Sequence, residues 1–172
     1  QVYQLHNRIG YGSADRMLTP YEILKPGGIA DAFQAVREAG LTEHIGITAL
    51  GETGPVRDVI ASRRFQTAQV YYNLLNSSSG HNVEPRYETS DFRGLLGACK
   101  ANGVGVFGIR ILAAGVLATN ERHGREIPIT PNSTPAEEQA RAERAWAALG
   151  PRNEPHAATA VRYALAEDRL SA

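Results

Sequence analysis

The chain has 172 residues, which is long enough for one domain with a sizeable core. Hydrophobic residues make up 42% of it and charged residues 21%, close to the average of soluble globular proteins, and this excludes disordered and collagen-like classes. Lys plus Arg and Asp plus Glu both number 18, so no net field draws the chain toward phosphate backbones or anionic membranes. We therefore expect a small-molecule partner, with no nucleic acid and no membrane.

Cysteine and histidine usage indicates neither a disulfide nor a metal centre. The single Cys99 has no partner for an intramolecular disulfide, and we interpret it as a small buried hydrophobe on a helix face. His44, His81, His123 and His156 lack metal-ligand spacing, so we expect them in solvated loops or at helix ends and predict no metal. No apolar run approaches the ~20 residues of a membrane span. No signal-like segment opens the chain, and the cytoplasm is the expected location.

The first half of the chain alternates strand-like and helix-like segments. Gln1–His6 is a strand-like run without a preceding cap or turn, from which we expect that an N-terminal part is absent. Gly28–Ala39 has apolar residues at three- and four-residue spacing, which predicts a helix. His44–Thr48 predicts a buried strand, a second helix begins near Thr53, and Phe65–Asn73 predicts another strand.

The second half continues the same alternation. Asp91–Asn102 predicts a helix and Val104–Leu112 a mostly apolar strand. Thr134–Glu137 has the sequence Thr-Pro-Ala-Glu, a capping-box start for a helix that runs to about Leu149. Pro155–Asp168 predicts the last helix, and the chain stops where a further strand is due.

Strands that alternate with amphipathic helices predict parallel pairing through right-handed crossovers. This pattern fits a doubly wound sheet, such as a flavodoxin-like binding domain, as well as a β/α barrel, and periodicity does not choose between them. A barrel is expected to place Val, Ile and Tyr side chains in its interior layers. The two longest irregular stretches, Asn7–Pro26 and Ala113–Ser133, are of a length that is uncommon unless it is functional.

One glycine motif has a dinucleotide-binding pattern in the wrong context. Gly103–Gly108 matches G-x-G-x-x-G, a motif that has to follow a strand and open a helix. Here the glycines follow a predicted helix and lie inside a predicted strand. We interpret them as a helix cap and as close packing positions.

Polar residues stand at or near the ends of the predicted strands. His6 closes the first strand, Thr48 and Gln69 lie in or near the ends of the next two, and Arg110 closes the fourth. The carboxyl ends of parallel strands meet at one rim, so we predict that these four side chains converge there. Taken alone, a structural role for His6 and an ordinary ion pair for Arg110 remain open.

Four segments occur in an order and spacing that resembles the aldo-keto reductases: Val2–His6, Ile45–Thr48, Gln69–Asn73 and Ile111–Leu117. The resemblance covers nearly the whole chain, from that family's fourth barrel strand to its seventh helix. It implies a partial (β/α)8 TIM barrel in which parallel strands alternate with helices. We therefore treat residues 1–172 as a single partial domain, with the N-terminal βα units and the last unit absent.

The resemblance also implies a chemistry. The family uses NADPH, or NADH, to reduce aldehydes or ketones to alcohols, with a Tyr acid assisted by Lys, Asp and His. Only the histidine has a counterpart here, His6, which is then the catalytic residue that orients or polarises the carbonyl. Gln69 and Thr48 are expected to hold the nicotinamide carboxamide. The residues expected to line the pyrophosphate are Arg110, Leu112 and Gly115.

The chain departs from the family's pattern at several places. Thr48-Ala49 stands where the family has a Ser-Asn pair, and Ile109 stands where an aromatic often stacks on nicotinamide. The tetrad's Tyr, Lys and Asp belong to units with no counterpart in this chain, and its own early tyrosines do not replace them: Tyr3, Tyr11 and Tyr21. We expect the chain alone to be inactive, and the alternative is a non-catalytic partial-barrel binding module. The carbonyl substrate, the choice of nucleotide and the oligomeric state stay open.

Overall fold

Four strands lie side by side in the order β1-β4-β5-β6, and every neighbouring pair is parallel. They are β1 (Val2–Leu5), β4 (His44–Thr48), β5 (Thr67–Tyr71) and β6 (Gly105–Ile109). The computed structural model describes residues 1–12, 17–84, 90–121, 130 and 133–172. The predicted parallel arrangement of strands and helices is confirmed.

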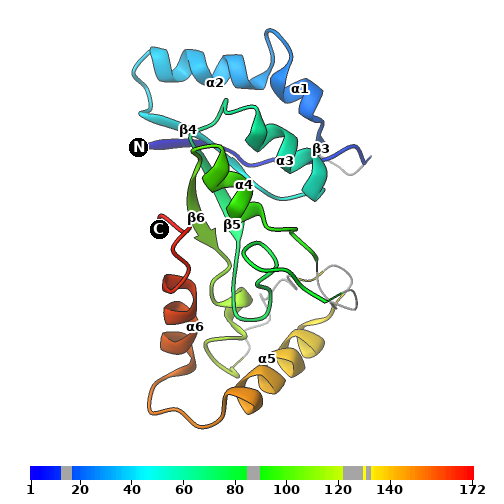
Figure 1. Cartoon of the computed structure of the whole chain (residues 1–172), viewed down its shortest axis with the longest axis vertical. Coiled ribbons are helices and arrows are strands. Elements are labelled where there is room, and N and C mark those ends of the chain that lie inside the picture. Colours follow the sequence, from blue (N-terminus) through cyan, green and yellow to red (C-terminus); the bar gives the residue numbers. More distant parts are fainter. Residues whose placement is uncertain (13–16, 85–89, 122–129, 131–132) are drawn as a thin grey trace.

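Helices cover one face of this sheet. They are α1 (Pro20–Leu24), α2 (Ile29–Glu38), α3 (Thr53–Ala61) and α4 (Leu95–Ala101), and they contribute buried side chains to the same core as the strands. Figure 1 shows α2, α3 and α4 along the sheet. A second, two-stranded parallel sheet pairs β2 (Arg8–Ile9) with β3 (Met17–Leu18).

The apolar side chains of the strands point toward the helices. Leu5, Ile45, Ile47 and Val70 are all at most 5% exposed and belong to the core that α1–α4 complete. Successive residues of a strand point to opposite faces, so the residues between them lie on the other face, which we call the open face. The expectation that interior layers consist of Val, Ile and Tyr is wrong for Ile and Val here, because the Ile and Val side chains of β4 and β5 face the helices, whereas Tyr71 lies on the open face.

Polar side chains occupy the open face and pair across the strands. Gln4 donates from Nε2 to the carbonyl oxygen of Ile47 at 2.9 Å, and the hydroxyl of Thr67 lies 3.4 Å from Gln4 Oε1. Gly46 lies between them, and a Cβ there would come within 2.1 Å of both Gln4 Oε1 and Thr67 Oγ1. The polar side chains of the open face thus form hydrogen bonds from strand to strand, where a barrel interior of apolar side chains would have only packing contacts.

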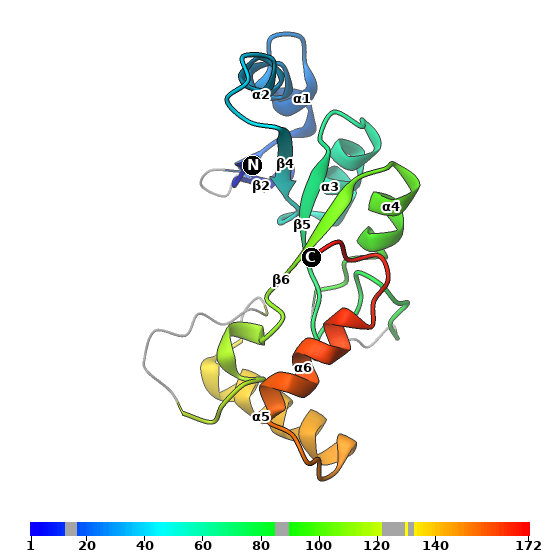
Figure 2. The same ribbon diagram turned by 90° about the vertical axis from the view of Figure 1, so that its left-hand side faces the viewer.

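The remaining elements form a second region at the other end of the molecule. They are η1 (Ala113–Gly115), α5 (Pro135–Leu149) and α6 (His156–Leu165), and both views place α5 far from α1 and α2 (Figures 1 and 2). A small separate cluster of Ala, Val and Leu residues holds them together. After α6 the chain returns to the sheet, where Ser171 N donates to Val106 O at 2.8 Å. Gly108 N donates to Ala172 O at 2.7 Å, so the tail extends the sheet beyond β6.

Several predicted boundaries are corrected. The helix predicted to start at Asp91 begins at Leu95, because Gly94 before it adopts φ 68°. β6 stops at Ile109 because Arg110 adopts φ 60° and turns the chain. Tyr71 likewise ends β5 two residues before the predicted end, and α6 is shorter than predicted at both termini.

The stretch predicted to be irregular before residue 26 contains β2, β3 and α1. Helix α1 starts with a capping box in which Glu22 N and the Thr19 hydroxyl pair at 3.2 Å. The structure does not describe residues 13–16 of this stretch, nor residues 122–129 and 131–132 of the later irregular stretch, which include His123. Cys99 is fully buried on α4, as predicted. In the described part of the chain, no helix is long and apolar enough to span a bilayer.

Candidate functional site

Three of the predicted site residues form one hydrogen-bonded line at the carboxyl end of the sheet. His6 Nδ1 lies 3.0 Å from the hydroxyl oxygen of Thr48, and that hydroxyl donates to Gln69 Oε1 at 2.9 Å. We call these three residues the rim row. The predicted convergence of His6, Thr48 and Gln69 is therefore confirmed as geometry, while their chemical roles stay predictions.

The strand register produces this line. Leu5 pairs with Ile47, which places His6 beside Thr48, and Thr48 pairs directly with Gln69. Because side chains alternate along each strand, all three point to the open face. Thr48 is 1% exposed and sits in the middle, whereas His6 at one end is exposed to solvent. The row therefore has a buried centre and an accessible imidazole.

Arg110 lies just beyond the end of β6, three residues after Phe107, the strand partner of Gln69, and among the described residues no hydrogen bond links Arg110 to the rim row. Its carbonyl oxygen accepts from Asn73 Nδ2 at 3.0 Å. Asn73 is fully buried, and its Oδ1 accepts from the backbone N–H groups of Leu75 and Asn76, each at 2.9 Å. Asn73 thus fixes the turn after β5 to the turn after β6. Sequence reasoning missed this role, although Asn after a strand is a known turn former.

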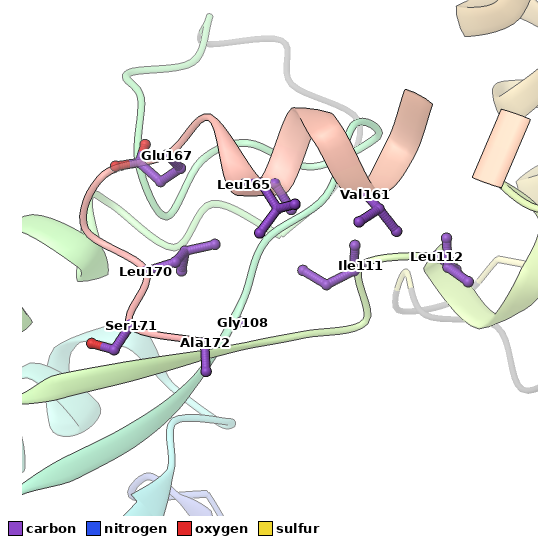
Figure 3. A pocket seen from close by; sticks show the side chains of 10 residues that line it. Gly108, Ile111, Leu112, Val161, Leu165, Glu167, Leu170, Ser171 and Ala172 are labelled. Atoms are coloured by element: carbon purple, nitrogen blue, oxygen red, sulfur yellow. The ribbon is translucent and has the colours of Figure 1, made fainter. Parts of the chain in front are cut away.

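Leu112 and Gly115, the other predicted cofactor residues, belong to the loop that contains η1. Leu112 lines an apolar pocket of about 350 Å³, in which Ile111 on one side faces Val161 and Leu165 of α6 on the other (Figure 3). Gly115 adopts φ 98°, and a Cβ there would meet nothing within 4 Å. In the described part of the chain, neither residue is hydrogen-bonded to the rim row.

The segment after His6 is fixed to the segment after Thr48 by contacts that the sequence did not reveal. Ile9 forms a parallel bridge with Gly51, whose φ of 124° and 2.1 Å Cβ approach to Ile9 O require glycine. The Glu52 carboxylate accepts from the backbone N–H groups of Tyr11 and Gly12 at 3.2 and 3.1 Å. These contacts hold the rim loop that follows the imidazole.

Among the described residues, no tyrosine is hydrogen-bonded to the rim row as a proton donor. Tyr71 follows Gln69 on the open face, but its hydroxyl is buried without a hydrogen-bond partner among the described residues. Burial, with a smaller contribution from Glu138, raises the pKa of Tyr71 against the opposing effects of Arg110 and of the neighbouring Asn73 side chain. Tyr3 points the other way and packs against Phe33, with ring centroids 4.6 Å apart.

A polar cluster ties the last residues of the chain to the loop after β5. Arg169 binds both carboxylate oxygens of Glu167 at 2.5 and 2.6 Å and donates to the carbonyl of Gly80 at 2.9 Å. The Tyr72 hydroxyl lies 3.2 Å from His81 Nε2. In the described residues no group of three or more His, Cys, Asp or Glu is placed to hold a metal ion.

A model described as the aldo/keto reductase family matches residues 2–172. Among solved structures, the chain is similar to the aldo-keto reductase AKR11C1 from Bacillus halodurans in its holo form, with a TM-score of 0.62, 18% identity, and coverage of 99% of this chain and 46% of that chain. It is also similar to the glycerol dehydrogenase AKR11B4 from Gluconobacter oxydans, with a TM-score of 0.55, 15% identity, and coverage of 98% and 47%.

At these identities the structural likeness concerns the fold, which is that of part of a TIM barrel. The chain spans about half the length of the two structures. The search of curated proteins found no match. The flavodoxin-like alternative is thereby excluded, because the family match covers the chain from residue 2 to residue 172.

Proposed function

The chain belongs to the aldo/keto reductase family of oxidoreductases, and we propose that it contributes the rim row to an NAD(P)H-dependent enzyme that interconverts aldehydes or ketones with alcohols. The observation that supports this proposal is the hydrogen-bonded line of His6, Thr48 and Gln69 at the carboxyl rim of parallel strands. In β/α barrels, this rim is where active sites are built.

The residues of the row fit a nicotinamide. Gln69 directs its amide oxygen to Thr48, and its NH2 group makes no hydrogen bond within the described part of the chain, which leaves a donor for a carboxamide oxygen. The open conformation at Gly115 and the exposed side chain of Arg110 suit an anionic pyrophosphate nearby. NADPH or NADH, when bound, would supply the hydride for the carbonyl carbon.

The part played by the chain's own residues is binding and orientation. His6 is accessible at the end of the row and would contact the substrate oxygen, while Thr48, which is itself hydrogen-bonded to Gln69, contacts the imidazole at Nδ1. A positioned general acid typically contributes ~10²–10⁴ in rate. Because no tyrosine of the described residues meets the row, we expect the 172-residue chain alone to bind nucleotide weakly and to show no turnover.

Binding is tested by titrating NADPH into the ¹⁵N-labelled chain and following side-chain amide signals by NMR. We expect the Gln69 NH2 signals to move and the Gln69→Leu variant to lose affinity by about tenfold or more, the value of one well-placed hydrogen bond. Gln34→Leu on α2, which changes an amide on the opposite side of the sheet, is the matched control. Equal affinity of all three proteins contradicts the proposed nicotinamide site.

Turnover is tested with benzaldehyde by following NADPH oxidation. No reaction above the uncatalysed rate is expected for the chain. Turnover that His6→Ala abolishes would show that the missing acid is supplied within these 172 residues. Nucleotide binding without turnover is also the behaviour expected of the alternative, a non-catalytic binding module, and only the same assay on the chain joined to the rest of a barrel separates the two.

A further inference from the structure

An asparagine and a glycine adjoin at the end of α4, and the proposed function uses neither of them. Asn102 ends the helix with φ −106° and ψ 6°, and the exposed Gly103, the first glycine of the G-x-G-x-x-G match, follows with φ 69°. A Cβ on Gly103 would meet nothing within 4 Å. The turn therefore has room for a change of backbone conformation at these two residues.

An asparagine carboxamide is open to attack by the backbone nitrogen of the residue that follows it. The Gly103 nitrogen forms a bond to Cγ of Asn102, its proton passes through water to the Asn102 NH2 group, and that group leaves as ammonia. A water molecule then opens the resulting succinimide ring, which yields aspartate by addition at Cγ or isoaspartate by addition at the backbone carbonyl carbon. Glycine favours the attack, because it has no Cβ to crowd the nitrogen and rotates freely into the required conformation.

The folded structure holds the two reacting groups apart. At ψ 6° the Gly103 nitrogen eclipses the backbone nitrogen of Asn102, whereas ring closure requires it beside the side chain. The carboxamide is held at both ends, because Arg63 Nε donates to its Oδ1 at 3.2 Å and its Nδ2 donates to the carbonyl oxygen of Ala98 at 2.9 Å. The Gly103 N–H itself donates to the carbonyl oxygen of Lys100 at 3.3 Å. The attack therefore requires that the end of α4 opens.

We propose that Asn102-Gly103 is a site of spontaneous deamidation and that the hydrogen bond from Arg63 protects it in the folded chain. Arg63 follows the end of α3, so this bond joins the ends of α3 and α4. The ring closes only after both side-chain hydrogen bonds of Asn102 have broken. One hydrogen bond shifts such an opening equilibrium about two- to tenfold. The inference does not depend on the proposed oxidoreductase function.

The site is tested on the unchanged chain, incubated in mildly alkaline buffer with and without urea and then analysed by mass spectrometry of its peptides. We expect Asn102 to be converted in urea and to be converted about tenfold or more slowly in the folded chain, as two hydrogen bonds imply. The exposed Asn153, which glutamate follows, is the internal control and is expected to stay intact. An intact Asn102 in urea, or conversion of Asn153 at the same rate, overturns the site. Equal rates for Asn102 with and without urea overturn its protection.

The role of Arg63 is tested with Arg63→Ala. The matched control is Arg57→Ala on α3, which removes an exposed guanidinium that donates to the carbonyl oxygen of Arg93 instead. We expect conversion of Asn102 in the folded chain to be about two- to tenfold faster in Arg63→Ala and unchanged in Arg57→Ala. In urea we expect all three proteins to react at the same rate, because the contact is then absent. A guanidinium that stabilised the charge developing on Oδ1 would make Arg63→Ala slower, so a slower or unchanged rate in its folded state overturns the protective role.

Discussion

Residues 1–109, the sheet region, and residues 110–172, the helical region, are stabilised by different interactions. The sheet region has a continuous core of large aliphatic side chains beneath α1–α4. The separate cluster of the helical region has five buried residues, three of them alanine, against which Leu74, Leu75, Leu112 and Trp146 pack only partly buried: Ala113, Val116, Leu117, Ala142 and Ala160. Burial of aliphatic area is the main stabilising term in folding, so the scaffold of the rim row is the more stable part.

Polar groups distinguish the two regions as well. Four buried side-chain polar atoms make no hydrogen bond in the described residues: three lie on α5, of which Glu138 Oε2 forms an ion pair with Arg141 Nη1 at 3.1 Å instead, and the fourth is Tyr71 Oη. Helix α5 is held instead by its capping box and by the contacts of Glu138. The comparison implies that the helical region opens at a lower free energy than the sheet region.

The largest loss of stability is expected from a substitution in the core of the sheet region. Ile47 is 1% exposed and lies between strands and helices, so Ile47→Ala removes packed methyl groups and leaves a cavity. We expect the free energy of unfolding in urea to fall by about 2–5 kcal/mol. The control is Leu165→Ala on α6, which is 77% exposed and is expected to change stability by less than about 0.5 kcal/mol. Equal losses would contradict the comparison.

The next effect concerns the buried carboxylate of the helical region. Glu138 accepts from Ser133 Oγ at 2.5 Å and Thr130 N at 3.0 Å and pairs with Arg141 Nη1 at 3.1 Å. Burial acts to raise the pKa of Glu138, but these hydrogen bonds and the guanidinium outweigh it and leave the pKa below its usual value. The contribution of Glu138 to stability is therefore fully present above its unfolded pKa of about 4.3 and is lost as pH falls through the folded value.

We expect Glu138→Gln to destabilise α5 at pH 7 by about 1.5–3 kcal/mol, the range for hydrogen bonds to charged groups. The deficit relative to the unchanged chain is expected to shrink as pH is lowered below about 4.3, because the unfolded chain then takes up a proton at Glu138 before the folded chain does, and to vanish once pH lies below the folded pKa as well. Hydrogen exchange of α5 amides measures both effects. The exposed Glu143→Gln serves as control, and a deficit that is constant with pH would argue against this role for the charge.

A smaller effect compares one capping box in each region. Thr134→Ala removes the side-chain cap of α5, and Thr19→Ala removes the same feature from α1. Each loss costs about 1 kcal/mol. We expect faster amide hydrogen exchange along α5 in Thr134→Ala. In Thr19→Ala we expect the β4 amides to stay protected from exchange, because the buried side chain of Ile23 also holds α1 in place. Loss of β4 protection in Thr134→Ala would mean that the regions unfold together.

The two capping boxes also show how far sequence reasoning reaches. Thr-Pro-Ala-Glu at residue 134 correctly predicts the start of α5, whereas Thr-Pro-Tyr-Glu at residue 19 gives the same signal for α1 inside a stretch that its length alone marks as irregular. The strand ends correctly brought His6, Thr48 and Gln69 together, because parallel register follows from the order of elements.

Other features depend on tertiary contacts that a single sequence does not specify. The alternation Ile45-Gly46-Ile47-Thr48 shows that two faces differ but not which face meets the helices, and this is why the content of the open face was mispredicted. The role of Asn73 depends on the position of Arg110, 37 residues away in sequence. The functional roles assigned to Arg110, Leu112 and Gly115 stay predictions.

The smallest expected effect uses two adjacent tyrosines with opposite surroundings. The Tyr71 hydroxyl is buried without a partner among the described residues, whereas the Tyr72 hydroxyl meets His81 Nε2 at 3.2 Å and its ring stacks on Tyr163. Removing a hydrogen-bonded hydroxyl costs about 0.5–1.5 kcal/mol, while removing one that is buried and unpaired relieves a desolvation cost.

We therefore expect Tyr72→Phe to lower the free energy of unfolding by about 1 kcal/mol and Tyr71→Phe to leave it unchanged or raise it by up to about 1 kcal/mol. Urea titrations of the two variants and the unchanged chain measure the difference, and the substitutions are matched because each removes one oxygen from the same residue type. If Tyr71→Phe is the more destabilising of the two, the Tyr71 hydroxyl has a partner when the protein is in solution. The buried polar groups between the sheet region and α5 would then be hydrogen-bonded like those of the rim row. The difference in stability between the two regions would in that case depend on their apolar cores alone.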